Sequence, residues 1–474
     1  MIFHSVEFIT VFLPIVLVLY YLISDKFGVE CEKVFLIVAS FIFYSVASVK
    51  LLYALVISIV VNYLFAKIIE RSLSKLFCSI AIISNALALC YYKYTNFFMD
   101  NITSALHREF VPLEIIAPLG ISFWTFQQIS FLVDTYKKEV KGSYFIDYLL
   151  YITFFPKLIS GPITRYNELV EQFKIKATLK YSNIFSGLNI FTIGLIKKGI
   201  IANVFSEYVS LGYTDPFNLS FLESWFTILS FSAQIFFDFS GYTDMALGSA
   251  KMFNINLPDN FNLPYSAVSV QDFWRRWHIS LSKFLRDYLY FPLGGSRCKT
   301  FNIYRNILIT FVVCGVWHGA SLMFILWGLI HGIGVCINKL WSKTKINLPR
   351  WVSVVFTFIY VSYAWIFFKS ENFKQAADII KSSVNVSNFF VPRIKWLSVY
   401  FRETGHCYND MIGYFCLATI GYFLFEKIKC CEFLNVRYPT LKFKVYCTSI
   451  VAFFWGVYYH ITKSVIEEFL YFKF

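Results

Sequence analysis

The stretch NILITFVVCGVWHGASLMFILWGLIHGIGVCI, residues 306–337, contains no Asp, Glu, Lys or Arg. It is too long and too apolar for the core helix of a soluble protein, and long enough to enter a membrane. His318 lies in its middle, where an imidazole must be neutral or paired because hydrocarbon offers it no water. The small residues beside it leave room for a backbone or a ligand. We therefore expect chemistry at His318.

The composition extends this interpretation to the whole chain. Of its 474 residues, 57% are hydrophobic and only 15% are charged, whereas soluble proteins carry about 25% charged residues. The alternating pattern of a membrane β-barrel is absent, so helices must satisfy the backbone in lipid. The sequence predicts an all-α polytopic membrane protein with roughly 11–13 transmembrane or re-entrant helices. The apolar runs lie at 8–23, 35–49, 51–69, 76–92, 144–155, 184–196, 225–237, 352–368, 411–425 and 445–461.

The polar interruptions between these runs are too short to fold alone. We therefore predict one integral membrane domain over residues 1–474, with a catalytic core at about 110–340 and peripheral helices at 1–100 and 350–474. The segment SENFKQAADIIK after residue 369 predicts a surface helix, because Phe373, Ala376, Ala377 and Ile380 recur at helical spacing. The start MIFHSVEF lacks a basic region and a cleavage site, which predicts an uncleaved first span.

The net charge of +14 resides in short loops between apolar runs, which is typical of positive-inside topology and not of nucleic-acid binding. The 11 cysteines form no CxxC pair, and most lie inside apolar runs. They are expected to be small buried hydrophobes and not a disulfide framework or metal site.

Two polar segments interrupt apolar runs in the middle of the chain. FFPKLISGPITRY, residues 154–166, ends near Arg165, for which contact with lipid headgroups is the simpler explanation. AQIFFDFSGYTDMALG, residues 233–248, places Asp238 directly after an apolar run. An acidic group there is either functional or the cap of a following helix beside water, and both readings stay open.

A third segment, DFWRRWHISLSKFLRDYLYFPLGGSR at 272–297, alternates aromatic and cationic residues. At about 100° per residue its apolar side chains form one stripe, which predicts an amphipathic helix lying in or dipping into the membrane face. His278 lies at the boundary of this stripe. By the same geometry, His331 on a helix continuous with His318 points roughly 220° away from it, so we expect His331 to bond a neighbouring helix or a backbone carbonyl. The stripe comprises Phe273, Trp274, Trp277, Leu281, Phe284, Leu285 and Tyr288.

These segments together carry a family resemblance. The run at 272–297 followed by CGVWHGAS at 314–321 closely resembles the membrane-bound O-acyltransferase (MBOAT) family. Within it the match is to the bacterial branch of alginate O-acetylases and teichoic-acid D-alanyltransferases, and more to the alginate side. FPKLISGPITRY, FFDFSGYTDMALGSAKMFNINLPDNFNLPY and the closing EEFLYFKF agree in order. Only the loop at 385–410 is atypical.

The resemblance implies a helical bundle with a central tunnel or funnel that carries out acyl transfer. The implied donor is a cytoplasmic thioester, acetyl-CoA, and no bound cofactor or metal is needed. The implied acceptor is an extracytoplasmic polysaccharide (an exopolysaccharide, capsule or peptidoglycan), reached through a partner with an SGNH-hydrolase fold. The location is then the plasma (inner) membrane of a bacterium. His318 corresponds to the family histidine, and His278 to a second polar position.

Chemically, an imidazole is the natural base for attack of a hydroxyl on a thioester. We expect His318 to be the general base and His278 to orient the hydroxyl or stabilise the oxyanion. Asp238 is expected to order a helix break near the tunnel. The remaining candidates for donor or substrate binding are Trp274, Arg275, Arg276, Arg297 and Trp317, although lipid headgroups explain the arginines equally well.

Two alternatives remain. The same fold with other cargo would deliver D-alanine from a carrier protein to teichoic acid. A proton-coupled transporter or flippase would use the buried histidines differently, but the motif match and the absence of visible repeats argue against it.

Overall fold

The computed structural model describes residues 1–46, 49–344, 346–388, 408–430, 450–451 and 453–454. Every regular element within these ranges is a helix, which confirms the all-α prediction. The longer helices are α1 (Leu13–Phe27), α2 (Val29–Ser45), α3 (Val49–Ser72), α4 (Lys75–Ala105), α5 (Ile121–Tyr136), α9 (Tyr181–Ile196), α10 (Asn203–Thr214), α11 (Phe221–Met252), α14 (Thr300–His318), α15 (Leu322–Trp341), α16 (Arg350–Lys369), α17 (Phe373–Val384) and α19 (Tyr408–Cys430). The shorter ones are α6 (Phe145–Thr153), α7 (Phe155–Leu158), α8 (Tyr166–Phe173), α12 (Val270–Arg276) and α13 (Ile279–Leu285).

Within the described ranges, seven helical segments are long and apolar enough to cross a membrane, so the chain is a multi-pass membrane protein. They are Phe8–Phe27, Val49–Ser72, Lys75–Ala105, Tyr181–Thr214, Thr300–His318, Leu322–Trp341 and Arg350–Lys369. The predicted surface helix is present as α17, although its buried face is centred on Ala376 and Ile379 while Phe373 is exposed. Most of the run at 445–461 and the closing EEFLYFKF lie outside the described residues.

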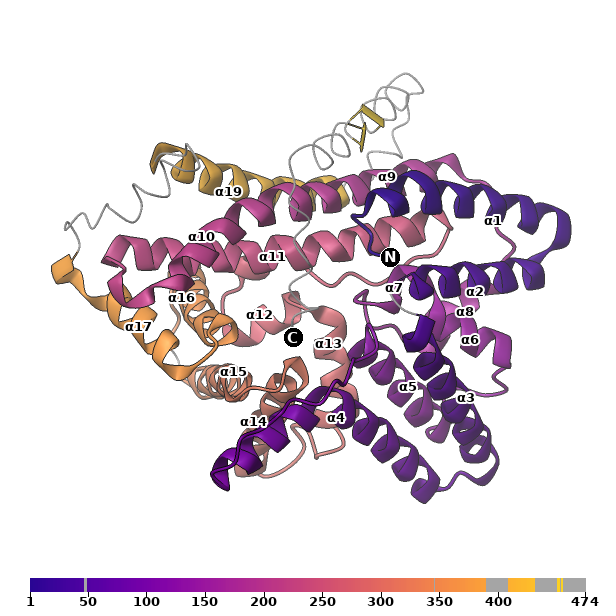
Figure 1. Ribbon diagram of the computed structural model, residues 1–474, viewed down its shortest axis with the longest axis horizontal. Helices are drawn as coiled ribbons and strands as arrows, with labels where there is room; N and C mark the ends of the chain where they lie inside the picture. Colours follow the sequence, from indigo (N-terminus) through magenta and orange to yellow (C-terminus); the bar gives the residue numbers. More distant parts are fainter. Residues whose placement is uncertain (47–48, 345, 389–407, 431–449, 452, 455–474) are drawn as a thin grey trace.

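The short helices α12 and α13 lie in the interior of the view in Figure 1, with the longer helices arranged around them. Helix α12 packs against α15 and α16, and α13 follows it directly. The apolar stripe predicted for 272–297 is therefore turned inward: Phe273, Trp274 and Trp277 are all buried. The segment is not one amphipathic helix, because it is interrupted at His278 and continues beyond α13 as a π-helical turn, Arg286–Tyr290.

Helix α11 is the scaffold of the other half of the bundle, and it runs beside α9 in Figure 1. Glycines seven residues apart on each helix face one another. A Cβ on Gly194 would lie 2.5 Å from the carbonyl oxygen of Gly241, and a Cβ on Gly187 would lie 2.6 Å from that of Gly248. The two backbones approach this closely because no side chain separates them, which is how membrane helices gain packing energy without a hydrophobic driving force.

We predict that Gly241→Ala destabilises the protein by about 1–3 kcal/mol, as overpacking of a close contact does. The added methyl would lie 2.8 Å from both the Gly194 carbonyl oxygen and the Lys198 amide nitrogen, which are backbone atoms that cannot rotate away. The midpoint of thermal unfolding in detergent measures the effect. Gly413→Ala is the matched control, because a methyl group added to that helical glycine would have no neighbouring atom within 4 Å. An unchanged unfolding midpoint for Gly241→Ala would contradict the close backbone contact between α9 and α11.

Candidate active site

His318 is the last residue of α14, and its side chain is buried inside the bundle. The chain does not continue as one helix through 306–337: Gly319 is extended, and α15 begins after Ser321, whose hydroxyl accepts from the amide of Met323 at 3.2 Å. The two helices then pack closely, because a Cβ on Gly315 would collide with the Phe324 carbonyl oxygen. The charge-free run is thus a helical hairpin with the imidazole at its turn.

His278 occupies the break between α12 and α13 and is fully buried. Its φ of +43° lies in the left-handed region, which a non-glycine residue adopts only where the surrounding structure enforces it. Asn260 provides that constraint. Its carbonyl accepts from the Ile279 amide at 3.0 Å, and its side-chain oxygen accepts from the Ser280 amide at 3.1 Å. Strain of this kind concentrates at functional sites.

Trp317 lies next to both predicted histidines. Its ring centroid is 6.2 Å from that of His278 and 4.8 Å from that of His318. The structure therefore brings together His278 and His318, which are forty positions apart in the sequence. The indole ring of Trp317 lies next to both. The buried indole N–H of Trp317 has no hydrogen-bond partner among the described residues, so a donor is available there for a ligand.

His331 is closer to this group than helical geometry predicted, because the continuous helix assumed for that prediction does not exist. Trp327 lies 4.9 Å from His318 and 4.9 Å from His331, measured between ring centroids. The expectation of a partner on a neighbouring helix is correct: the indole N–H of Trp274, on α12, donates to Nδ1 of His331 at 3.2 Å. Trp274 is thus held by a histidine within the bundle.

A cavity of about 450 Å³ adjoins this cluster. It is lined by Lys93 of α4, by Phe123 at the start of α5, and by Gly319 and Ala320 in the turn after His318. The ring of Phe123 lies 5.7 Å from that of Trp317. Ser122 and Ser160 add hydroxyl groups to the lining. The cavity is large enough for a substrate segment and reaches within one side chain of the two histidines.

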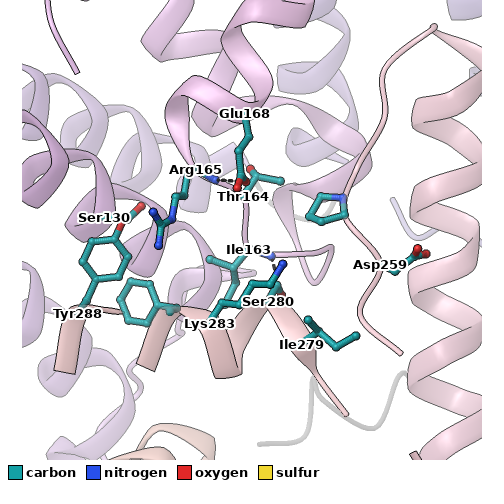
Figure 2. A pocket seen from close by; sticks show the side chains of 12 residues that line it. Ser130, Ile163, Thr164, Arg165, Glu168, Asp259, Ile279, Ser280, Lys283 and Tyr288 are labelled. Carbon is teal, nitrogen blue, oxygen red and sulfur yellow. Dashed lines mark hydrogen bonds between the residues drawn. The ribbon is translucent and has the colours of Figure 1, made fainter. Parts of the chain in front are cut away.

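A smaller, more charged pocket is lined in part by Ile279 and Ser280, which follow His278 in the chain (Figure 2). Figure 2 shows Arg165 and Glu168 above it and Lys283 below it, with Tyr288 at one side. The guanidinium of Arg165 pairs with Asp287, and the Tyr288 hydroxyl donates to Asp134 at 2.7 Å. The lining thus contains both cations and acids, and Arg165 and Tyr288 are each bound to a carboxylate outside the lining.

A row of stacked aromatic rings joins the two regions. Phe126 stacks on Trp317 at 5.2 Å and on Phe284 at 4.2 Å, and Phe284 lies 4.9 Å from Tyr288. The backbone makes the same connection. Ile159 and Ser160 line the larger cavity, and residues 163–165 line the charged pocket. The segment FFPKLISGPITRY thus runs from one to the other.

Asp238 does not mark a helix break, contrary to the sequence-based expectation, and it caps no helix. Helix α11 continues through it to Met252, and its carboxylate forms a buried ion pair with Lys198. Six residues further along α11, Asp244 pairs with Lys197 at 2.7 Å. Both lysines lie in a π-helical turn, Lys197–Ala202, which extends α9. The cost of an acidic group at this depth is thus offset by a paired lysine.

The predicted arginines do not line either cavity. Arg275 and Arg297 are exposed, and Arg276 pairs with Asp272 of its own helix at 3.0 Å. Arg165 and Lys283 take the position near the site that the sequence interpretation gave to those three. The sequence contained a signal for Arg165, since the segment preceding it is broken by prolines and glycine. For Lys93 the signal was weaker: one cation directly after the apolar run at 76–92.

Comparison with known proteins agrees with the helical architecture and the motifs. The profile of the membrane-bound O-acyltransferase family (MBOAT) matches residues 58–373. The chain is 40% identical to the peptidoglycan O-acetyltransferase of Helicobacter pylori, over 82% of this chain and 80% of that protein. It is 35% identical to the "Probable alginate O-acetylase AlgI" of Pseudomonas aeruginosa, over 79% of this chain and 73% of that protein. The teichoic acid D-alanyltransferase of Bacillus subtilis is 31% identical over 55% of this chain and 71% of that protein.

The family profile and these relatives define the class of this multi-pass helical protein, which is a membrane-bound acyltransferase. The chain belongs to the membrane-bound O-acyltransferase family. It is therefore an enzyme of acyl transfer, as the sequence motifs predicted. No cluster of three or more His, Cys, Asp or Glu side chains suited to a metal ion occurs in the part of the chain that the structure describes.

We predict that Asp238→Ala destabilises the protein by about 3–5 kcal/mol, because it leaves the buried Lys198 ammonium without this carboxylate. The double substitution Asp238→Leu with Lys198→Met should recover most of the loss, since replacing both charges by apolar groups is often neutral. Thermal unfolding in detergent measures stability, and acyl transfer measures function. A double variant that is stable but inactive would show that the Asp238–Lys198 pair acts in the reaction and not only in the scaffold.

A second prediction concerns pH. Burial raises the pKa of Asp134 from its usual value of 3.8 to about 6, against the opposing hydrogen bond from Tyr288. The folded state therefore binds more protons than the unfolded state between about pH 4 and pH 6, and this group makes stability fall as the pH rises through that window. Asp134→Asn should remove this part of the pH dependence of the unfolding midpoint. Asp100→Asn, at an exposed position on α4, is the control. An identical slope for Asp134→Asn and the native protein would contradict the assignment.

Proposed function

We propose that this protein transfers an acetyl group from cytoplasmic acetyl-CoA towards an extracytoplasmic polysaccharide, with His318 as the general base. The host membrane is the plasma membrane of a bacterium, and a partner with an SGNH-hydrolase fold completes the transfer. The names of the relatives support the acetyl group and the polysaccharide. Proteins named for O-acetylation of peptidoglycan or alginate are 35–40% identical over about four fifths of this chain, whereas the match to a D-alanyltransferase covers 55% of it.

The observation that carries the proposal is the position of His318. It ends a membrane helix inside the bundle, beside a cavity of about 450 Å³, with Trp317 and His278 next to it. Burial among aromatic rings favours the neutral form of an imidazole, and only the neutral form accepts a proton. This is the protonation state that activation of a hydroxyl requires.

The reaction balances with the residues present. Nε2 or Nδ1 of His318 takes the proton of the acceptor hydroxyl as its oxygen attacks the thioester carbonyl. The carbonyl oxygen becomes negatively charged, and the N–H groups of Trp317 and His278 are the donors close enough to the cluster to stabilise it. Collapse of the intermediate breaks the carbon–sulfur bond. The imidazolium of His318 then returns its proton to the departing thiolate, giving free CoA and an acetyl ester.

The charged pocket of Arg165 and Lys283 is the part of the protein best suited to the phosphates of CoA, because guanidinium and ammonium groups bind phosphate oxygens strongly. The aromatic row from Tyr288 to Trp317 would then line the path of the thioester arm towards His318. This assignment replaces Arg275, Arg276 and Arg297, which lie away from both cavities. We assign the larger cavity to the acceptor.

The alternative cargo is D-alanine from a carrier protein, which the identity to teichoic acid D-alanyltransferases keeps open. An acidic carrier protein could also dock at the cations of the charged pocket, Arg165 and Lys283. Both donors carry a thioester and would react through the same base, so only an assay with each donor distinguishes the two functions.

We predict that His318→Ala lowers acetyl transfer from labelled acetyl-CoA by at least about 100-fold, the lower end of what a general base contributes. The assay uses the purified protein in vesicles with its acceptor or SGNH partner. His331→Gln is the matched control: it is equally buried and equally close to Trp327, and it keeps an acceptor for Trp274, so it should stay within about tenfold of the native rate.

Normal acetyl transfer by His318→Ala would disprove the role of His318 as the general base. Inactivity of the native protein with acetyl-CoA, together with activity on a D-alanyl carrier protein, would move the assignment to the alternative cargo.

A further inference from the structure

Helix α4 makes an unusual contact with the end of α14. The ammonium of Lys93 donates to the carbonyl oxygen of Trp317 at 2.7 Å and to that of His318 at 3.0 Å. The hydroxyl of its neighbour Tyr94 donates to the carbonyl oxygen of Val316. Three consecutive carbonyl groups, the last three of α14, are thus bound by two adjacent side chains of a helix more than two hundred residues away in the sequence.

These carbonyls need such partners. The last four carbonyls of an α-helix have no intrahelical donor, and burial without a partner is costly. Helices commonly solve this with a left-handed glycine, but Gly319 is extended, with φ −177° and ψ 165°, and provides no such cap. A lysine at this position satisfies the carbonyls and also places positive charge at the negative end of the helix dipole.

The contact joins elements that otherwise pack separately. The principal packing partners of α4 are α3 and α5, while those of α14 are α15 and the turn that follows α13. Lys93 and Tyr94 therefore hold the turn that carries His318 through hydrogen bonds and not through a helix interface. Lys93 also lies over the ring of Trp317, at 5.9 Å from its centroid, and lines the larger cavity with Gly319 and Ala320.

We infer that Lys93 is a positioning residue of the acyl-transfer reaction, which fixes Trp317 and His318 by capping the end of α14, with Tyr94 as its auxiliary. The inference rests on the proposed role of His318. Displacement of a base by about 1 Å costs on the order of 100-fold in rate, so the hold on this helix end has a direct kinetic consequence. The bonds are made to backbone carbonyls, so Lys93 acts through the two residues that it holds and not on the substrate.

The test compares kcat and the KM values for acetyl-CoA and for the acceptor in Lys93→Met, Lys93→Arg and Tyr91→Phe, purified and reconstituted as full chains. Lys93→Met should lower kcat by at least about tenfold and leave KM for acetyl-CoA within about twofold, because the geometry of the base changes and not the donor pocket. Lys93→Arg keeps donors and charge and should recover most of kcat. Tyr91→Phe removes a hydroxyl from an exposed position on the same helix that lines neither cavity, and it should behave as the native protein.

A native kcat for Lys93→Met would overturn the inference, and so would a loss that Lys93→Arg fails to recover. A rise in KM at unchanged kcat would also overturn it, because it would make Lys93 a substrate-binding group. If Lys93→Met cannot be purified, Lys93→Gln, which keeps an N–H donor, is measured by the same criteria. The outcome is separable from that for the general base. An active His318→Ala disproves the proposed function, whereas an inactive His318→Ala with a native Lys93→Met disproves only the role of Lys93.

Discussion

Helix α14 ends at the buried His318, and its final carbonyl groups have no donor within the helix. In a membrane-embedded bundle this constraint is severe, because neither lipid nor apolar side chains replace the missing donors. Lys93 and Tyr94 supply them. With the helix end stabilised, the chain can turn at residues 319–321 and return as α15, which packs closely where Gly315 faces Phe324. That return places Trp327 beside His318 and brings His331 against Trp274 of the interior helix α12.

The opposite half of the bundle is constrained in a different way. Helices α9 and α11 meet at glycines, and two buried lysine–carboxylate pairs fasten the π-helical turn after α9 to α11. Phe239 belongs to the same helix α11, and its ring centroid lies 4.8 Å from that of His278. Polar residues in this half thus serve mainly the scaffold. Polar residues around α12, α13 and the end of α14 line the two cavities and interrupt helices. Departures from local helix propensity of this kind are expected at functional sites.

The two spaces beside the histidine cluster differ in chemistry. One is larger and is bounded by the turn after His318, and the other is small and rich in charge. Helix α5 and the segment at 159–165 contribute to both, and the stacked rings of Phe126 and Phe284 lie along the way between them. Under the proposed function, donor and acceptor arrive from opposite sides of the membrane, and the two spaces would give each substrate its own entry to His318. The acceptor side then coincides with the space that Lys93 lines.

The sequence by itself determined the membrane class, the helical architecture and the family, because hydrophobic runs and ordered motifs are local properties of the chain. From the same motifs it also proposed His278 and His318 as the site. It also predicted the surface helix at 373–384 from its spacing. Only the tertiary structure decided that residues 306–337 form a hairpin, that Asp238 pairs with Lys198, and that Arg165 and Lys93 lie near the site while Arg275 and Arg297 do not. Periodicity reports which face of a helix is apolar, but it carries no information on which distant helix supplies a counter-charge or a donor. Those partners depend on how the helices pack, and that is fixed by contacts between residues far apart in the sequence.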